Sequence, residues 1–289
     1  MDNFQDFSLT VPVQSQNMQL DQFLSKSLPL SKARIHQAIE EGGVYINKKR
    51  CQETALQLQG GEKLRIVTLT HETLIPFSKE QIIWQQSPFF LIHKKSGQYA
   101  QEALHRSQGT LPDELAKHLR LDPEQTKKFR PVHRLDRDTS GLMLLCSDPK
   151  QLQQIQNLWH SHVQKSYLAI VSPAPDWDHK RMTFPIGKRR NQQGNYAVDQ
   201  QGRACDTEAK VLERSGGKAL LQLIPHTGRT HQLRIHLSHL GCPILGDHRY
   251  GGKKHARLML HAHTLCVQVP ALSKNHTWRT DPEEDWQWQ

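Results

Sequence analysis

The sequence predicts an α+β protein whose larger part is built on a mainly antiparallel, mixed sheet. Short β-like runs such as QIIW, FFLIHK, GLMLLCS and KSYLAIV follow one another from about residue 81 onward, and the main helical stretches between them cover residues 110–119 and 150–162. The pattern before this region is different, with two short helices followed by strands. Because the change occurs around Ile75 and Pro76, we expect a small domain over residues 1–75 and a larger one over residues 76–289.

The small domain is expected to begin with a pair of helices. The residues that would face its core from these helices are Leu20, Phe23, Leu24, Ile35, Ala38 and Ile39. Pro29 separates the two helices, and the hydroxyl of Ser31 can cap the second by accepting a hydrogen bond from a free backbone N–H. A pair of glycines then ends the second helix, and strands are expected at residues 44–46 and 63–67.

The charge balance points to nucleic acid as a partner. Lys and Arg number 38 against 28 Asp and Glu, which gives a formal net charge of +10 and a pI near 9.4. Basic side chains displace counterions from phosphates, although charge alone is equally compatible with an ordinary solvated surface. The candidate phosphate contacts in the small domain are Lys32, Arg34, Lys48 and Lys49.

Composition argues against several other classes of protein. The mean hydropathy is −0.68, and no run approaches the roughly 18 apolar residues that a spanning helix needs. The first residues, MDNFQDFSLT, do not have the pattern of a secretory signal. The five cysteines include no C-x-x-C pair, so neither a disulfide framework nor a zinc ribbon is predicted, and a cytoplasmic location is expected. The final residues, TWRTDPEEDWQWQ, are expected to form a loose tail.

The segment PVHRLDRDTSGLMLLCS, residues 131–147, is the first that can carry chemistry. Asp136 and Asp138 flank Arg137 in a charge-dense loop, and an apolar strand follows. Thr, Ser and Gly after the aspartates can form a tight turn, so the loop could present one carboxylate from a rigid strand edge. On residue types alone, a salt-bridged surface turn explains the segment slightly better.

Two further segments are candidates. In IPHTGRTHQLRIHLSHLGCPILGD, residues 224–247, a helix is expected to start at Thr230. Its histidines His231 and His236 are five residues apart, which is not the spacing of two metal ligands on one helical face, so no metal site is predicted. In KSYLAIV, residues 165–171, Tyr167 alternates with apolar residues of a strand, and a buried core tyrosine is the simpler interpretation.

Taken in order, these segments resemble a known family. HRLDRDTSGL, KSYLAIV, TGRTHQLRIHLSHLGCPILGD and the later RLMLHAHTL are similar to the successive motifs of the RluA-type RNA pseudouridine synthases, over about residues 81–269. Residues 18–67 resemble the alpha-L RNA-binding domain first known from a small-subunit ribosomal protein. Two departures stand out: Lys94-Lys95 replaces the family's usual Lys-Pro pair, and the basic helix before the tyrosine is weakened to LWHSHVQK.

The resemblance implies an isomerase that turns uridine into pseudouridine with the catalytic carboxylate of Asp136 and without any cofactor. It further implies that Arg234 pairs with Asp136, that Tyr167 stacks on the uracil, and that Leu260 forms an apolar wall. The candidate RNA contacts in the larger domain are His133, Arg134, Arg137 and Arg229.

The resemblance favours large-subunit ribosomal RNA as the substrate, because family members that act on transfer RNA often lack the N-terminal domain. A transfer-RNA synthase and a non-catalytic RNA-binding or ribosome-assembly protein are the alternatives. A metal-dependent hydrolase built on the aspartates and histidines is a third possibility. We expect a monomer that binds RNA and needs neither membrane nor metal.

Overall fold

The computed structural model describes residues 4–69, 75–188, 196–272, 275–283, 285 and 286. It divides into two compact units, Met1–Ile75 with Gln101–Leu115, and Pro76–Ala100 with Ala116–Gln289. The first division falls where the sequence pattern changes. Residues 101–115, which the sequence analysis assigns to the larger domain, group with the smaller unit.

The small unit contains a four-stranded antiparallel sheet in the order β1-β4-β2-β3. Its strands are β1 (Phe4–Thr10), β2 (Val44–Ile46), β3 (Lys49–Cys51) and β4 (Lys63–Leu69). Two of them match the expected strands. The sequence analysis did not identify β1, in which only Phe7 and Leu9 alternate as partly buried apolar residues.

The two helices of the small unit are confirmed. They are α1 (Leu20–Ser27) and α2 (Lys32–Glu40), and all six residues expected in their core are buried. The Ser31 hydroxyl accepts a hydrogen bond from the backbone N–H of Arg34, as expected of a helix cap. Asn47 and Lys48 both have positive φ and form the turn between β2 and β3, which presents the basic side chains of Lys48 and Lys49 to solvent.

Residues 101–110 are attached to the small unit by polar contacts. The guanidinium of Arg106 pairs with the carboxylate of Glu41 at 2.6 Å, and the Ser107 backbone N–H donates to the Glu41 carbonyl at 2.7 Å. The hydroxyl of Tyr45 donates to the Leu104 carbonyl. These contacts explain why the segment groups with the small unit although the larger unit surrounds it in sequence.

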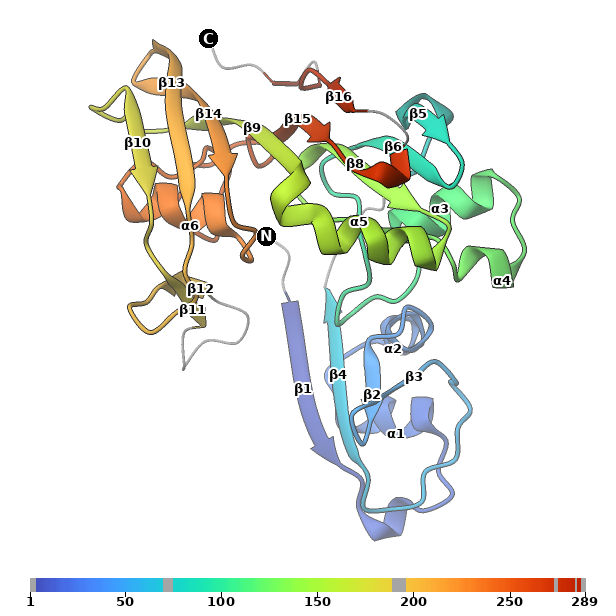
Figure 1. Cartoon of the computed structure of the whole chain (residues 1–289). Helices are drawn as coiled ribbons and strands as arrows, with labels where there is room; N and C mark the ends of the chain where they lie inside the picture. Colours follow the sequence, from blue (N-terminus) through green and yellow to red (C-terminus); the bar gives the residue numbers. More distant parts are fainter. Residues whose placement is uncertain (1–3, 70–74, 189–195, 273–274, 284, 287–289) are drawn as a thin grey trace. The chain divides into compact units, whose positions relative to one another are not determined.

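The larger unit is built on one mixed sheet of ten strands, counted over the described residues. The order is β10-β13-β14-β9-β15-β8-β6-β5, with β16 beside β15 (Figure 1). The short β7 pairs with β8. The strands are β5 (Ile82–Gln86), β6 (Phe89–Lys94), β7 (Arg130–Pro131), β8 (Ser140–Cys146), β9 (Val163–Val171), β10 (His179–Met182), β13 (Thr207–Ser215), β14 (Lys218–Pro225), β15 (Leu260–Val267) and β16 (His276–Arg279). Every pairing is antiparallel except β8 with β15, which agrees with the expected mainly antiparallel, mixed sheet.

Helices support this sheet. Ile155 of α5 (Pro149–His162) packs into the apolar cluster formed by β6, β8 and β15. The helix α6 (Gln232–His239) begins two residues later than expected and contacts the small hairpin of β11 (Ile186–Lys188) and β12 (Tyr196–Val198). Over the described residues, the other α-helices are α3 (Leu111–His118), whose first residues group with the small unit, and α4 (Pro123–Thr126). Short 3-10 turns lie at Lys79–Gln81 and Pro270–Leu272 and, in the small unit, at Val13–Ser15.

The C-terminal residues are more ordered than the sequence predicts. The expected loose tail is wrong in part, because residues 276–279 form β16 and pair with β15.

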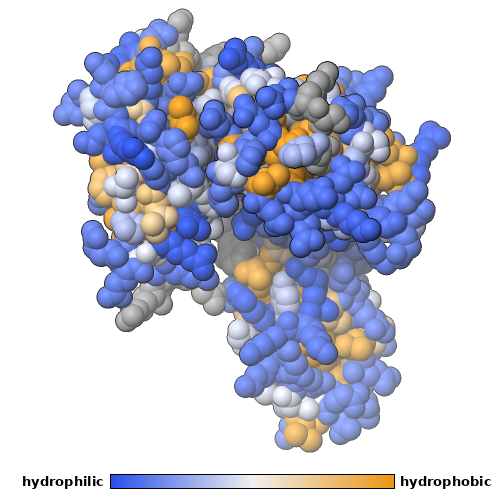
Figure 2. Space-filling view, viewed as in Figure 1, coloured by the Kyte–Doolittle hydropathy of each residue, from blue (hydrophilic) through white to orange (hydrophobic). Residues whose placement is uncertain are grey.

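Among the described residues, no helix is both long and apolar enough to cross a membrane. On the face in view, the surface of each unit is mostly hydrophilic with small apolar patches (Figure 2).

Candidate active site

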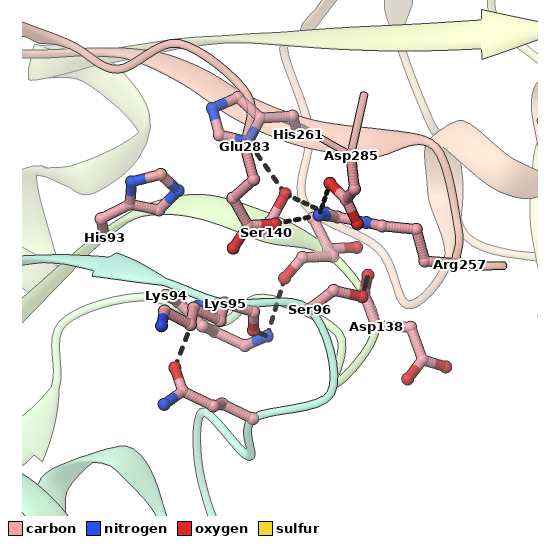
Figure 3. Close-up of polar contacts among 12 residues, drawn as sticks. His93, Lys94, Lys95, Ser96, Asp138, Ser140, Arg257, His261, Glu283 and Asp285 are labelled. Carbon is pink, nitrogen blue, oxygen red and sulfur yellow. Dashed lines mark hydrogen bonds and ion pairs between the residues drawn. The ribbon is translucent and has the colours of Figure 1, made fainter. Parts of the chain in front are cut away.

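Asp136 lies in the loop between β7 and β8, and the side chain of a buried lysine holds the backbone of that loop by hydrogen bonds. The ammonium of Lys94, at the end of β6, donates to the carbonyls of Arg137 at 2.6 Å and Thr139 at 2.7 Å. Burial lowers the pKa of Lys94 to about 7, against the opposing charges of Asp138 and Asp136. The side chain of Ser96 adds a hydrogen bond to the Asp138 carbonyl (Figure 3). The loop backbone is therefore held at each residue from 137 to 139.

A guanidinium from α6 meets this loop. The Nη1 of Arg234 donates to Oδ2 of Asp136 at 3.1 Å. On its other edge, Arg234 makes two parallel hydrogen bonds of 2.7 and 2.8 Å to the fully buried carboxylate of Asp247. Burial alone would lower the pKa of Arg234, but the hydrogen bonds and charge of Asp247, followed by the charge of Asp136, hold it above its ordinary value. Arg234 is thus a fixed cation that directs the Asp136 carboxylate.

A cavity opens beside this ion pair. Its empty volume is about 680 Å³. The lining includes Asp136, Arg234, Tyr167 of β9 and Leu260 of β15, and it is shared between four segments that are distant in sequence. A carboxylate, a guanidinium and an aromatic ring thus line one cavity, as a binding site for an aromatic, polar ligand requires.

Two other ring and amine groups of the cavity have shifted pKa values. Burial, and secondarily the charge of Asp136, raise the pKa of the Tyr167 phenol, so that the hydroxyl keeps its proton at neutral pH. Burial lowers the pKa of Lys165 to about 8, and its ammonium lies 5.8 Å from the centre of the Trp159 ring. The cavity lining therefore includes a neutral aromatic ring and a largely desolvated amine.

His231 caps α6 in a left-handed conformation, with φ of 55°. Its Nδ1 lies 2.7 Å from the hydroxyl of Tyr250, and its Nε2 lies 3.7 Å from Oδ2 of Asp136. Burial lowers the pKa of this imidazole to about 4, although the charge of Asp136 opposes the shift. The ring is consequently neutral at pH 7.

The structure distributes the remaining candidate residues over several places. Arg134 and Arg229 are exposed and line the cavity. Arg137 instead pairs with the neighbouring Asp138 at 2.8 Å, and His133 stacks on Trp159, and neither belongs to the cavity lining. Lys32, Arg34, Lys48 and Lys49 belong to the small unit. Over the described residues, no group of three or more His, Cys, Asp or Glu side chains is placed to hold a metal ion.

Sequence reasoning did not single out several residues of this site, namely Asp247, Tyr250 and Lys165. Asp247 ends the motif LGD and follows Gly246, whose positive φ of 81° lets the chain turn there. An aspartate directly after such a glycine, downstream of an arginine-bearing helix, was the available signal. Lys165 lies two residues before Tyr167, on the same face of the strand, and could have been found from that alternation.

The sequence profile of the RNA pseudouridylate synthase family matches residues 88–239, and that of the S4 domain matches residues 18–64. The first match spans the carboxylate loop, the tyrosine strand and the arginine helix. The chain belongs to the RNA pseudouridylate synthase family. It is accordingly an isomerase that converts uridine in RNA to pseudouridine, with an S4 domain as its small unit.

Curated relatives of this pseudouridine synthase align over most of its length. It is 30% identical over 276 residues to ribosomal large subunit pseudouridine synthase C of Escherichia coli, which covers 89% of this chain and 85% of the relative. It is 31% identical over 285 residues to ribosomal large subunit pseudouridine synthase D of Neisseria meningitidis, covering 91% and 75% of the two chains.

Solved structures have the same fold. The human RNA pseudouridylate synthase domain containing 1 is 25% identical, with a TM-score of 0.60 over 72% of this chain and 86% of its own. The human RNA pseudouridylate synthase domain containing 4 is 28% identical, with a TM-score of 0.58 over 72% and 90%. The expected family and α+β fold are thereby confirmed.

Proposed function

We propose that this synthase isomerises uridines of large-subunit ribosomal RNA, with Asp136 as the catalytic carboxylate. The observation that carries the proposal is the contact of 3.1 Å between Arg234 and Asp136 at the wall of the cavity that Tyr167 and Leu260 also line. Arg234 cannot turn away, because Asp247 holds its other edge. One oxygen of Asp136 is therefore fixed and the other is left for the substrate.

The reaction is balanced within the nucleotide. The N1–C1′ bond breaks, the uracil turns, and a C5–C1′ bond forms, while C5 loses a hydrogen and N1 gains one. Asp136 acts at the sugar–base junction, either by attack on C1′ or by removal of a sugar proton. Since substrate and product are isomers, no electrons are exchanged and no group is donated, so the chemistry requires no cofactor.

The cavity walls would take an extruded nucleotide. A uridine within a helix hides its glycosidic bond, so the target must be flipped out or lie in a loop. The ring of Tyr167 offers a face on which the uracil stacks, and Leu260 closes the apolar side. Arg134 and Arg229, at the exposed rim, are placed to bind phosphates, which fix position more than sequence.

Two observations support ribosomal RNA over transfer RNA as substrate. The chain carries an S4 domain with exposed lysines in its hairpin, and its curated relatives are named for the large ribosomal subunit. We further propose that the protein works as a monomer in the cytoplasm. Pseudouridine mapping of total RNA from cells with and without the gene tests the substrate, and losses confined to transfer RNA would contradict it.

Asp136→Asn tests the catalytic assignment. The amide keeps the size of the side chain but is neither a nucleophile nor a base, so we expect at least about a 10³-fold loss of rate. Release of tritium from C5-labelled uridine in RNA measures the reaction. Filter binding of the same RNA is the control, because affinity should change little. An Asn variant with undiminished release would reject Asp136.

A further inference from the structure

Acidic residues near the end of the described chain pair with Arg257, an arginine outside the cavity lining. Arg257 lies just before β15, and its side chain is only 8% exposed. Its Nη1 pairs with the carboxylate of Glu283 and, at 3.0 Å, with that of Asp285. Its guanidinium also lies 5.8 Å from the centre of the Trp286 ring. The tail therefore supplies the countercharges of this buried cation, as Figure 3 shows for the two carboxylates.

Through its other amine, Arg257 reaches the loop that carries the catalytic carboxylate. Nη2 donates to the hydroxyl of Ser140, the first residue of β8 and four positions beyond Asp136. Ser140 is fully buried, and its hydroxyl lies 2.8 Å from Nδ1 of His261. Because Nε2 of His261 faces the Thr280 carbonyl at 2.9 Å and must donate to it, Nδ1 accepts the proton of Ser140.

From this chain of contacts we infer that the C-terminal segment is a positioning element of the active site, which acts through Arg257 and Ser140 on the loop of Asp136. The segment consists of Thr280, Glu283, Asp285 and Trp286. It is connected to Ser140, where the loop ends, by two series of contacts. One runs from Glu283 through Arg257 to Ser140. The other runs from Thr280 through His261 to Ser140. The inference rests on the proposed role of Asp136.

Charge explains why the tail is needed. Two cations, Lys94 and Arg257, both contact the segment from Arg137 to Ser140, and the charge of Arg257 lowers the pKa of Lys94. Lys94 holds the loop carbonyls of Arg137 and Thr139, so its ammonium must stay in place. Glu283 offsets the repulsion, since its charge acts on Lys94 as well as on Arg257. Without the tail carboxylates, a buried guanidinium would be left unpaired beside the loop.

The double variant Glu283→Gln with Asp285→Asn removes the countercharges and keeps the side-chain shapes. We expect its single-turnover rate of tritium release to fall about ten- to a hundredfold, because small displacements of a reacting group are costly. Its affinity for the RNA should stay within about twofold, since the tail residues are not part of the cavity lining. Rates are measured at a temperature well below the midpoint of thermal unfolding of each variant, so that essentially all of the protein is folded.

Ser140→Ala separates positioning from general stability. It cuts the link to the loop and leaves the ion pairs of Arg257 in place, so it should slow the reaction to a similar extent. Combined with the tail variant, it should give no further loss, because the tail carboxylates act on the loop through the contact of Arg257 with Ser140, which Ser140→Ala has already removed. Should the tail variant fail to fold, the rate of Ser140→Ala alone decides, and an unchanged rate overturns the inference.

The matched control is Asp178→Asn, which removes the carboxylate from an exposed pair with Arg214 in the same unit. It should keep the native rate and affinity. A tail variant as fast as this control, or losses that multiply in the combined variant, would overturn the inference. An inactive native chain would instead remove the proposed function, so the two failures are distinguishable.

Discussion

At the scale of single residues, the site depends on one guanidinium shared by two carboxylates. Asp247 is fully buried and takes two hydrogen bonds from Arg234, whereas Asp136 is partly exposed and takes one. The buried carboxylate fixes the arginine, and the exposed one remains available to substrate. The planar guanidinium of an arginine can bind two carboxylates at once, because its N–H groups point along two defined edges. The ammonium of a lysine is a point charge without such edges.

Asp247→Asn tests this arrangement. The amide can keep one acceptor but loses its charge, so the buried Arg234 is left with a weaker anchor and Asp136 with a less defined partner. We expect a fall in the rate of isomerisation of about 10²-fold and a lower unfolding midpoint. Unchanged kinetics in tritium-release assays would show that Arg234 needs no such anchor.

At the scale of elements, the site exists because β8 and β15 run parallel and side by side. Their pairing sets His261 opposite Ser140 and Ala262 opposite Gly141, and so brings the carboxylate loop next to Leu260. Gly141 makes this approach possible. Its φ is +109°, and a Cβ there would lie 2.3 Å from the Ala262 carbonyl oxygen and 2.6 Å from its nitrogen. Any side chain would push the strands apart.

Gly141→Ala should therefore lower the free energy of unfolding by more than the conformational penalty of a positive φ. Gly217→Ala, in the turn between β13 and β14, is the matched control, since its φ is +73° but nothing lies within 4 Å of the added Cβ. We expect the control to lose about 1–2 kcal/mol of unfolding free energy, and Gly141→Ala to lose more and to be inactive. Denaturant unfolding measures both, and equal losses would refute the close approach.

The β2–β3 hairpin of the S4 domain is a second element, and its proposed contact with RNA can be tested separately from catalysis. Lys48 and Lys49 are exposed at its turn. Replacing both by Ala should weaken RNA affinity about two- to tenfold and reduce its salt dependence, because two phosphate contacts are lost. The rate constant at saturating RNA should stay the same. A variant with native affinity at every salt concentration would remove this hairpin from the RNA interface.

At the scale of the whole molecule, burial keeps several histidines neutral. Burial lowers the pKa of His133 to about 3, with help from Lys165, and that of His261 to about 3 and of His231 to about 4. In the unfolded chain each would bind a proton near its ordinary pKa of about 6.5. As the pH falls below that value, these histidines bind protons in the unfolded state but not in the folded state, so the free energy of unfolding decreases.

The free energy of unfolding should thus decrease from pH 7 to pH 5, by about 2 kcal/mol for each such histidine. Above pH 7 these groups contribute no further change. His133→Phe keeps a ring against Trp159 and removes one titrating group, so its pH dependence should be shallower. Denaturant unfolding at several pH values checks both, and a flat profile between pH 5 and 7 would contradict the buried neutral state.

The sequence by itself determined the α+β class, the helices of the small domain and the order of the motifs that line the cavity. These features are local: apolar spacing, caps and turns depend on neighbours in the chain, so Ser31 and the buried faces of α1 and α2 are as expected. The pairing of Arg234 with Asp136 came from resemblance to a family, because no local pattern links residues 98 positions apart.

Only the tertiary structure decided the rest. It turned Arg137 towards Asp138, stacked His133 on Trp159, and brought Asp247, Lys94 and the tail carboxylates to the loop of Asp136 or to the arginines that contact it. Charged side chains have no periodicity from which their partners can be read. Their partners are set by which strands lie together, and burial then makes each pairing obligatory, because an unpaired charge inside the protein costs several kcal/mol.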